Sequence, residues 1–102
     1  MKTEVIKPKV SIGMPVHNGA KTIEKAIKSL LAQTFQDFEL IISDNASDDE
    51  TKNICQRFAL QDERIHYVRQ TKNIGTYKNF NFLINSAKGK YFMWAADDDW
   101  RS

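Results

Sequence analysis

Residues 38–44 read Phe-Glu-Leu-Ile-Ile-Ser-Asp, an almost unbroken apolar run that ends in a carboxylate. Runs of this kind are typical of strands covered on both faces, as in parallel sheets. A second such run, Val-Ser-Ile-Gly-Met-Pro-Val, occupies residues 10–16. The two runs predict two buried strands, and the rest of the chain is interpreted around them.

Helical spacing of apolar residues separates these runs from two more. Stretches 22–33, 47–60 and 76–87 each carry an apolar stripe, and the stripe of the last contains Phe80, Leu83, Ile84 and Ala87. Short apolar runs at 65–69 and from Tyr91 onward predict a third and a fourth strand. Alternation of strand and helix implies parallel strands with right-handed crossovers. We therefore predict an α/β fold with an open, doubly wound, mostly parallel sheet.

Two of the expected helices begin with capping signals. Thr22 is the expected cap of the first. Ser47 and Glu50 have the spacing of a capping box, and Asp48 and Asp49 suit the positive end of the helix dipole. We therefore assign Asp48 and Asp49 to the helix start and not to a site.

Composition indicates one soluble globular domain. The chain has 102 residues, of which 41% are apolar and 27% charged. Its net charge of +2 comes from scattered Lys and Arg, which argues against a nucleic-acid surface. Cys55 is the single cysteine, so no disulfide forms within the chain and a reducing, cytoplasmic location is expected. No stretch approaches the roughly 20 apolar residues of a membrane span.

Polar residues follow every predicted strand. The four strand ends lead to Pro15-Val16-His17-Asn18, Asp44-Asn45, Asn73-Ile74-Gly75 and Asp97-Asp98-Asp99. In an open parallel sheet these ends share one edge, where ligands bind near the switch point of the strand order. The opposite edge receives residues 34–37 and 61–64, which have the composition of ordinary surface. The sequence thus predicts a ligand site at the carboxyl edge.

The acidic triplet indicates the chemistry of that site. Neighbouring carboxylates suit Mg²⁺ or Mn²⁺, which complete their coordination with substrate phosphates. Neither a G-x-G-x-x-G turn after the first strand nor a G-x-x-x-x-G-K-[ST] loop is present to hold phosphate instead. The inferred ligand is a nucleotide with a diphosphate. A solvated acidic turn is the alternative interpretation of the triplet.

The four strand-end motifs, in this order, resemble those of family 2 glycosyltransferases, the inverting nucleotide-sugar enzymes of the GT-A fold. Residues 15–18 resemble the family's Pro-Val-Tyr-Asn, and residues 33–49 resemble its segment from Gln-Thr to Asp-Asp-Gly-Ser-Thr-Asp. Residues 73–75 match its Asn-x-Gly turn, and residues 89–99 resemble the strand that leads into its Asp-x-Asp metal motif. The resemblance covers residues 10–100.

The resemblance implies roles for individual residues. Nucleotide binding falls to Pro15, Val16, His17, Asn18, Asp44, Asn73, Gly75 and Asp97, and binding of Mn²⁺ or Mg²⁺ to Asp98 and Asp99. For His17, which replaces the family's Tyr, the alternative is a loop residue packed on the first helix. For Asp44 the alternative is a turn partner of the loop 45–48. Lys78 is assigned to the solvated face of its helix.

The acidic motif departs from the family's pattern. Counted from Gly89, Ala96 stands where the family's first Asp is expected. Asp98 then takes the principal metal position, Asp97 a ribose or second-ligand position, and Asp99 the trailing position. A slip of one residue would pair Asp97 with Asp99 instead.

The implied reaction is metal-dependent transfer of a sugar, with inversion, from a nucleoside diphosphate sugar to an acceptor hydroxyl. A UDP-sugar is the expected donor and a glycan or lipid-linked molecule the expected acceptor. Residues 1–9 are expected to be a flexible lead-in and residues 10–102 the nucleotide-sugar-binding half. The catalytic base is expected beyond Ser102, in a longer protein at the inner face of the membrane, and self-association through uncovered apolar surface is expected for this piece.

Other classes of protein fit the residues less well. A non-catalytic nucleotide- or carbohydrate-binding module of the same fold is the main alternative, because Ala96 weakens the metal set. A signalling receiver domain needs an acidic pair after the first strand, where His17 and Asn18 stand. A nucleotidyltransferase needs a Gly-rich loop with a basic residue at that place, and the sequence has none.

Overall fold

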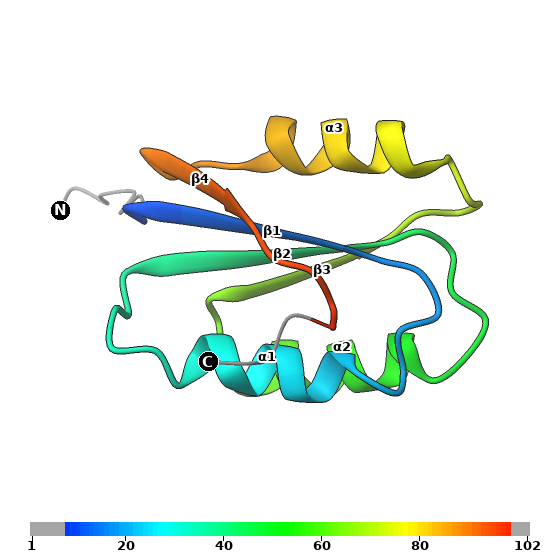
Figure 1. The fold of residues 1–102 in the computed structure, drawn as a ribbon, viewed down its shortest axis with the longest axis horizontal. Coiled ribbons are helices and arrows are strands. Elements are labelled where there is room, and N and C mark those ends of the chain that lie inside the picture. The colour runs from blue at the N-terminus through cyan, green and yellow to red at the C-terminus, as the bar shows by residue number, and fades with distance from the viewer. Residues whose placement is uncertain (1–7, 99–102) are drawn as a thin grey trace, which may run out of the picture.

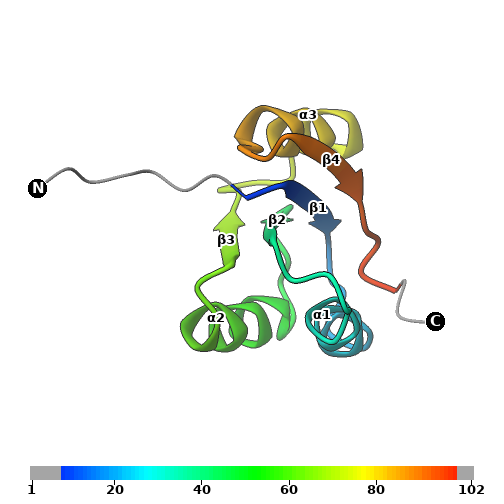
Figure 2. The same ribbon diagram turned by 90° about the vertical axis from the view of Figure 1, so that its left-hand side faces the viewer.

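The computed structural model describes residues 8–98, in which four strands alternate with three helices. The elements are β1 (Val10–Val16), α1 (Ile23–Leu31), β2 (Phe38–Asp44), α2 (Thr51–Gln61), β3 (Ile65–Arg69), α3 (Thr76–Ser86) and β4 (Tyr91–Trp94). All strand pairs are parallel, in the order β3-β2-β1-β4. Figures 1 and 2 show α1 and α2 on one face of the sheet and α3 on the other. The predicted open, doubly wound α/β sheet is confirmed; of the expected lead-in, residues 1–7 lie outside the described range.

The two central strands form the middle of the core. β1 and β2 pair from Val10 opposite Phe38 to Val16 opposite Asp44, and every residue of β2 is buried. Fully buried side chains from both strands and from α1 fill the space between the sheet and the helices: Ile12, Met14, Ile23, Ile27, Leu40 and Ile42. No helix in the described part of the chain is both long and apolar enough to cross a membrane.

The helix starts differ from the predicted caps. α1 begins after Thr22, but the Thr22 hydroxyl donates to Asp97 Oδ2 at 3.0 Å and does not cap the helix. α2 begins at Thr51, so the predicted capping box is wrong: Ser47 Oγ accepts a hydrogen bond from the backbone N–H of Asn18 at 2.7 Å. Both hydroxyls form hydrogen bonds with residues that lie far away in the sequence, and neither caps a helix.

Asp49 does serve the start of α2, as predicted. Its Oδ1 accepts a hydrogen bond from the Thr51 backbone N–H at 2.9 Å. Its Oδ2 accepts a second from the Ala20 N–H at 3.2 Å. These bonds lower the pKa of the Asp49 carboxyl against the opposing effect of burial, which is the largest single influence. Asp49 thus joins the loop after β1 to the first turn of α2.

The apolar stripe of α3 is only partly buried. Leu83 is fully buried against the sheet, together with Asn79, whereas Phe80 and Ile84 are 37% and 50% exposed. α3 packs over β1 and β2, and its Phe80 side extends over the short end strand β4. Of the apolar stripe read from the sequence, Leu83 is in the core, whereas Phe80 and Ile84 stay partly exposed because the sheet beneath that side of the helix ends at β4.

A buried polar cluster fixes the connection from α3 to β4. The Glu39 carboxylate, on β2, is 5% exposed and accepts hydrogen bonds from Ser11 Oγ at 2.5 Å and from the Lys88 backbone N–H at 2.8 Å. Ser11 Oγ in turn accepts the Gly89 N–H at 2.7 Å. The entry to β4 is thereby held against β1 and β2.

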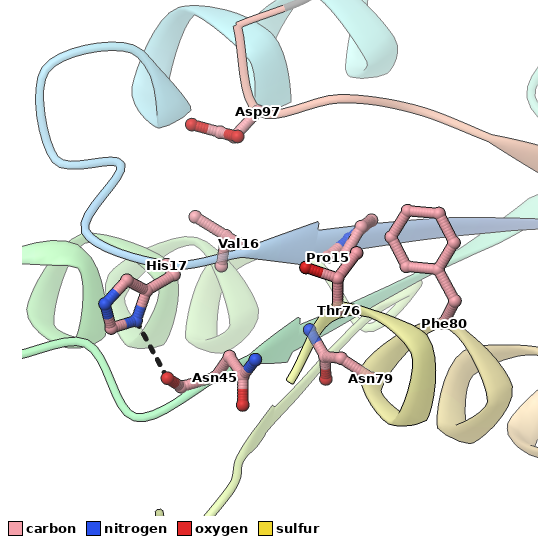
Figure 3. A pocket seen from close by; sticks show the side chains of 8 residues that line it. All are labelled: Pro15, Val16, His17, Asn45, Thr76, Asn79, Phe80 and Asp97. Carbon is pink, nitrogen blue, oxygen red and sulfur yellow. Dashed lines mark hydrogen bonds between the residues drawn. The ribbon is translucent and has the colours of Figure 1, made fainter. Parts of the chain in front are cut away.

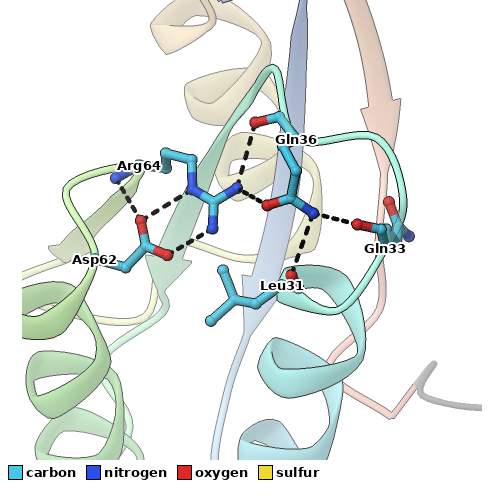
Figure 4. Close-up of polar contacts among 5 residues, drawn as sticks. All are labelled: Leu31, Gln33, Gln36, Asp62 and Arg64. Atoms are coloured by element: carbon cyan, nitrogen blue, oxygen red, sulfur yellow. Dashed lines mark hydrogen bonds and ion pairs between the residues drawn. The ribbon is translucent and has the colours of Figure 1, made fainter.

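The connectors at the amino edge of the sheet, interpreted from the sequence as ordinary surface, are joined by one arginine (Figure 4). Arg64 Nη2 lies 2.7 Å and Nε 3.0 Å from the two carboxylate oxygens of Asp62, a bidentate pair. Its Nη1 donates to Gln36 Oε1 at 2.7 Å, and the Gln36 amide reaches the carbonyl of Gln33. This contact ties the α1–β2 connector to the α2–β3 connector.

Candidate functional site

A pocket lies at the carboxyl ends of the strands, where the strand order reverses. The chain passes from β1 to β2 and β3 on one side and then returns to β4 on the other, so the ends of β1 and β4 flank the switch point. The pocket measures about 200 Å³ and is lined by Pro15, Val16, His17, Asn45, Thr76, Asn79, Phe80 and Asp97 (Figure 3). Sites that enclose a whole small-molecule ligand usually measure about 300–1,000 Å³. This pocket therefore fits one part of a larger ligand.

His17 contributes an exposed imidazole from the loop after β1. Its Nδ1–H donates to the backbone carbonyl of Asn45 at 2.8 Å, as Figure 3 shows. The Asn18 amide donates to its Nε2 at 3.4 Å. Both partners agree with a neutral ring that carries its proton on Nδ1. The loop after β2 thus sets the orientation of the ring at the mouth of the pocket.

Asp97 reaches the pocket from the segment after β4. Its Oδ2 accepts the hydrogen bond from Thr22, and a Cβ added to Gly19 would lie only 2.5 Å from the same oxygen. Only a glycine at position 19 lets the carboxylate approach the loop after β1 this closely. In Figure 3 the Asp97 side chain lies across the end of β1 from Asn45 and Asn79.

Asp44 lies behind the pocket and does not line it. The residue is fully buried; its Oδ1 accepts the Ser47 N–H at 2.9 Å, and its Oδ2 accepts the Tyr67 hydroxyl at 2.5 Å. Burial, and secondly the Asp44 carboxylate, raise the pKa of Tyr67 far above its usual range, so this hydroxyl remains a donor. The hydrogen bond from Ser47 favours the alternative interpretation of Asp44, in which it is a turn partner of the loop 45–48.

Asn73 and Gly75 shape the turn before α3 without lining the pocket. Gly75 has φ +87°, a conformation that side chains rarely adopt, and its N–H donates to Asn73 Oδ1 at 2.8 Å. Asn45 holds the turn from the other side: its Oδ1 accepts the Ile74 N–H at 2.8 Å and its amide donates to the Gly75 carbonyl at 3.3 Å. The turn places Thr76 and the first turn of α3 at the pocket.

Asn18 also acts on a loop rather than on the pocket. Its backbone has φ +53°, and its Oδ1 accepts the Asp48 N–H at 2.8 Å. Together with the bond from its own N–H to Ser47, this joins the loop after β1 to the loop after β2. Of the eight residues predicted to bind nucleotide, four line the pocket, and the other four hold the loops around it.

Sequence reasoning missed the contribution of α3. Thr76, Asn79 and Phe80 line the pocket although none was predicted as a site residue. Asn79 is 2% exposed; it accepts the Ser43 hydroxyl at 2.5 Å and donates to the Ser43 carbonyl at 3.1 Å. The available signal was spacing: positions i, i+3 and i+4 directly after the Asn-x-Gly turn share the helix face nearest the strand ends.

The acidic segment carries carboxylate oxygens that suit a metal ion held jointly by the protein and by substrate phosphates. Asp98 is exposed, and Asp99 lies outside the described residues. Within residues 8–98 no group of three or more His, Cys, Asp or Glu side chains is placed to hold a metal ion. One or two carboxylates with substrate phosphates suffice for Mg²⁺, whereas an all-protein cage needs more ligands. The residues present fit the first arrangement.

Residues 11–102 match the family model for glycosyl transferase family 2. The chain belongs to this family. A β-1,3-glucosyltransferase that acts on GalNAc(5)-diNAcBac-PP-undecaprenol, from Campylobacter jejuni, is 39% identical over 90% of the chain, which spans 30% of that protein. The putative teichuronic acid biosynthesis glycosyltransferase TuaG of Bacillus subtilis is 36% identical over 93% of the chain, which spans 38% of it. The chain thus covers about a third of these curated relatives.

Solved structures show the same fold. S. aureus TarS 1–349, which has also been solved with UDP and with UDP-GlcNAc, superposes with a TM-score of 0.81 at 26% identity, over 88% of this chain and 27% of the TarS 1–349 chain. The mannosyltransferase PcManGT from Pyrobaculum calidifontis gives a TM-score of 0.81 at 24% identity, which is evidence of fold alone. The sheet of this family 2 member is of the GT-A type.

Proposed function

We propose that residues 10–102 bind a nucleoside diphosphate sugar, in the first place a UDP-sugar, as the donor-binding part of an inverting glycosyltransferase. The observation that carries the proposal is the pocket at the switch point, with His17 on one side and Asp97 on the other. Membership of family 2 supports the class of reaction. The binding of UDP and UDP-GlcNAc by TarS supports the class of donor.

The volume of the pocket indicates which part of the donor would occupy it. The base and ribose would occupy the pocket against Pro15, Val16 and His17, since about 200 Å³ holds only part of a nucleotide sugar. The diphosphate and sugar would then extend past Asp97 toward Asp98. Asn18, Asp44, Asn73 and Gly75 would contribute by holding the loops that form the walls.

Asp98, with Asp99 or with Asp97, would hold a Mn²⁺ or Mg²⁺ ion. When bound, such an ion offsets the charge that develops on a leaving diphosphate. The role of Asp97 would be to orient the donor next to the ion, and the Thr22 hydroxyl would keep the Asp97 carboxylate in place. Transfer to a glycan or lipid-linked hydroxyl also requires a general base, which we assign to a longer protein and not to the residues described.

Calorimetric titration with UDP, in Mn²⁺ and in EDTA, tests donor binding. We expect binding that requires Mn²⁺ and that Asp98→Ala weakens by about tenfold or more, because a carboxylate ligand is lost. Asp48→Ala, at an exposed acid outside the pocket, is the matched control and should bind like the wild type.

His17→Ala should weaken UDP binding in Mn²⁺ but leave the requirement for Mn²⁺ unchanged, because the imidazole is expected to contact the base and not the metal. Tight binding of UDP in EDTA would support the non-catalytic module instead. A folded chain that binds no uridine or guanosine diphosphate in either condition would contradict the proposal.

A further inference from the structure

We propose that Asn79 selects the base of the donor, by donating a hydrogen bond to the C4 carbonyl of uracil. The inference rests on the proposed function, because it assigns a specificity-determining residue to the base end of the same pocket. Asn79 lies on α3, one turn after Thr76, and the side chains of both residues line the pocket. Asn79 is only 2% exposed, so a base that enters the pocket meets a buried amide.

Two hydrogen bonds to Ser43, on β2, fix the orientation of this amide. Asn79 Nδ2 donates to the Ser43 carbonyl at 3.1 Å, and Asn79 Oδ1 accepts the Ser43 hydroxyl at 2.5 Å. A carbonyl can only accept, so a flipped amide would set two acceptors against each other. Gln70 Nε2 donates to the same hydroxyl oxygen at 3.1 Å, which leaves the hydroxyl proton for Asn79. The amide nitrogen therefore keeps one direction.

The Asn79 nitrogen carries a second hydrogen that no hydrogen bond within residues 8–98 uses. A primary amide has two N–H donors, and the Ser43 carbonyl takes one of them. In Figure 3 the nitrogen is the end of the amide that points toward the other lining residues. A buried donor is stabilised by a ligand that offers an acceptor and destabilised by one that does not. Asn79 thus presents one donor, in a fixed direction, to a base in the pocket.

Asn45 is the alternative donor among the lining residues. Its amide bridges a turn, because Oδ1 accepts the Ile74 N–H at 2.8 Å and Nδ2 donates to the Gly75 carbonyl at 3.3 Å. Asn79, in contrast, is held between a helix and a central strand of the sheet. Groups on helices and strands are positioned more precisely than groups on loops. Since discrimination between similar bases requires a precisely placed donor, we assign it to Asn79.

A donor at this place separates uracil from cytosine. The two bases have rings of the same size, but at C4 uracil carries an acceptor oxygen, as thymine does, and cytosine carries a donor amino group. The carbonyl accepts the Asn79 N–H, whereas the amino group leaves two donors facing each other. A site built to hydrogen-bond a ligand group rejects an analogue that lacks this group, because buried polar atoms then have no partner.

Calorimetric titration with UDP and with CDP, both in Mn²⁺, tests the inference. The wild type should bind UDP about tenfold or more tightly than CDP. Asn79→Ala should bring the two dissociation constants within about threefold of each other, because the donor that separates the bases is lost. Asn85→Ala, at an exposed position on the same helix, is the matched control and should keep the ratio of the wild type.

Ser43→Ala distinguishes a contact with the base from a purely structural role of Asn79. This change removes the hydrogen bond to Asn79 Oδ1 but keeps the Ser43 carbonyl, which still holds the amide nitrogen. Both variants should unfold at lower urea concentration than the wild type, but only Asn79→Ala should lose the preference for UDP. Nuclear magnetic resonance of the wild type needs no variant: the side-chain amide protons of Asn79 should shift further in saturating UDP than in saturating CDP.

Several outcomes would overturn the inference and leave the proposed function standing. One is equal affinity of the wild type for UDP and CDP, or a preference for CDP, and another is a ratio that Asn79→Ala does not change. Loss of the ratio in Asn45→Ala but not in Asn79→Ala would assign base selection to the loop after β2. A folded wild type that binds neither UDP nor CDP would also overturn the inference, and the proposed function with it if GDP does not bind either.

Discussion

At the amino end of the β-sheet polar side chains bind one another, whereas at the carboxyl end several of them face a pocket. Arg64 is paired with Asp62 and Gln36, and Glu39 is hydrogen-bonded to Ser11 and to the connector before β4. At the carboxyl end Asp44 is equally satisfied, but His17 and Asp97 line the open pocket. A polar residue at a strand end therefore indicates a site only when its hydrogen-bond partners leave it accessible.

The largest expected effect concerns Cys55, a buried thiol on α2. Burial, followed by the charges of Asp44, Asp49 and Asp97, raises its pKa to about 12. With an ordinary thiol pKa of about 8.5, alkylation at pH 8 should be at least about a thousandfold slower in the folded chain than in urea. Because the unfolded thiol ionises first, stability should also fall between about pH 8.5 and pH 12.

Alkylation followed by mass spectrometry at several urea concentrations measures this difference, and denaturation of Cys55→Ser at each pH is the control for the thiol. Rapid labelling of the native protein at pH 8 would contradict the prediction, because it would show that the Cys55 thiol is accessible and readily ionised in the folded chain.

Asp44→Asn is expected to destabilise the fold by about 2–4 kcal/mol. The Ser47 N–H and the Tyr67 hydroxyl both donate to this buried carboxylate, and an amide nitrogen in its place would face a donor. Urea denaturation measures the loss. Asp98→Asn, at an exposed carboxylate of the same end, is the comparison. An equal loss of stability in the two variants would contradict the distinction between the buried, hydrogen-bonded carboxylate of Asp44 and the exposed carboxylate of Asp98.

Arg64→Ala should cost about 1 kcal/mol, because the bidentate pair with Asp62 is partly exposed and also holds Gln36. Hydrogen bonds from Arg64 lower the pKa of Asp62, so the contribution is present above about pH 4 and is lost as the pH falls through the lowered pKa. Denaturation midpoints of wild type and variant from pH 7 to pH 2 should therefore converge. Arg57→Ala, on a more exposed pair with Glu24, should change stability less.

Asp98→Asn is expected to have the smallest effect on stability, within about 0.5 kcal/mol, because the side chain is exposed. Thermal unfolding without metal measures it. A marked stabilisation by Asp98→Asn would mean that repulsion within the acidic segment strains the fold, and this would sharpen the contrast with the amino end.

Much of the fold could be predicted from apolar patterns alone. The predicted bounds of β1, β2 and β3 agree with the structure, because buried strands must be apolar along their whole length. The order of elements and the parallel sheet followed from the alternation of strands and helices. The helix starts could not be predicted in the same way, since Thr22 and Ser47 bind residues that lie far away in sequence.

The candidate site, like the fold, could be predicted from the sequence only in part. That polar residues gather at one edge follows from the amino-acid sequence, because parallel strands bring their carboxyl ends together. Which of these residues face the pocket depends on contacts between loops that are distant in the sequence. Asp44 shares the inward face of β2 with Leu40 and Ile42 and is enclosed by Ser47 and Tyr67. Asp97 remains at the pocket because Gly19 gives it room and Thr22 holds it there.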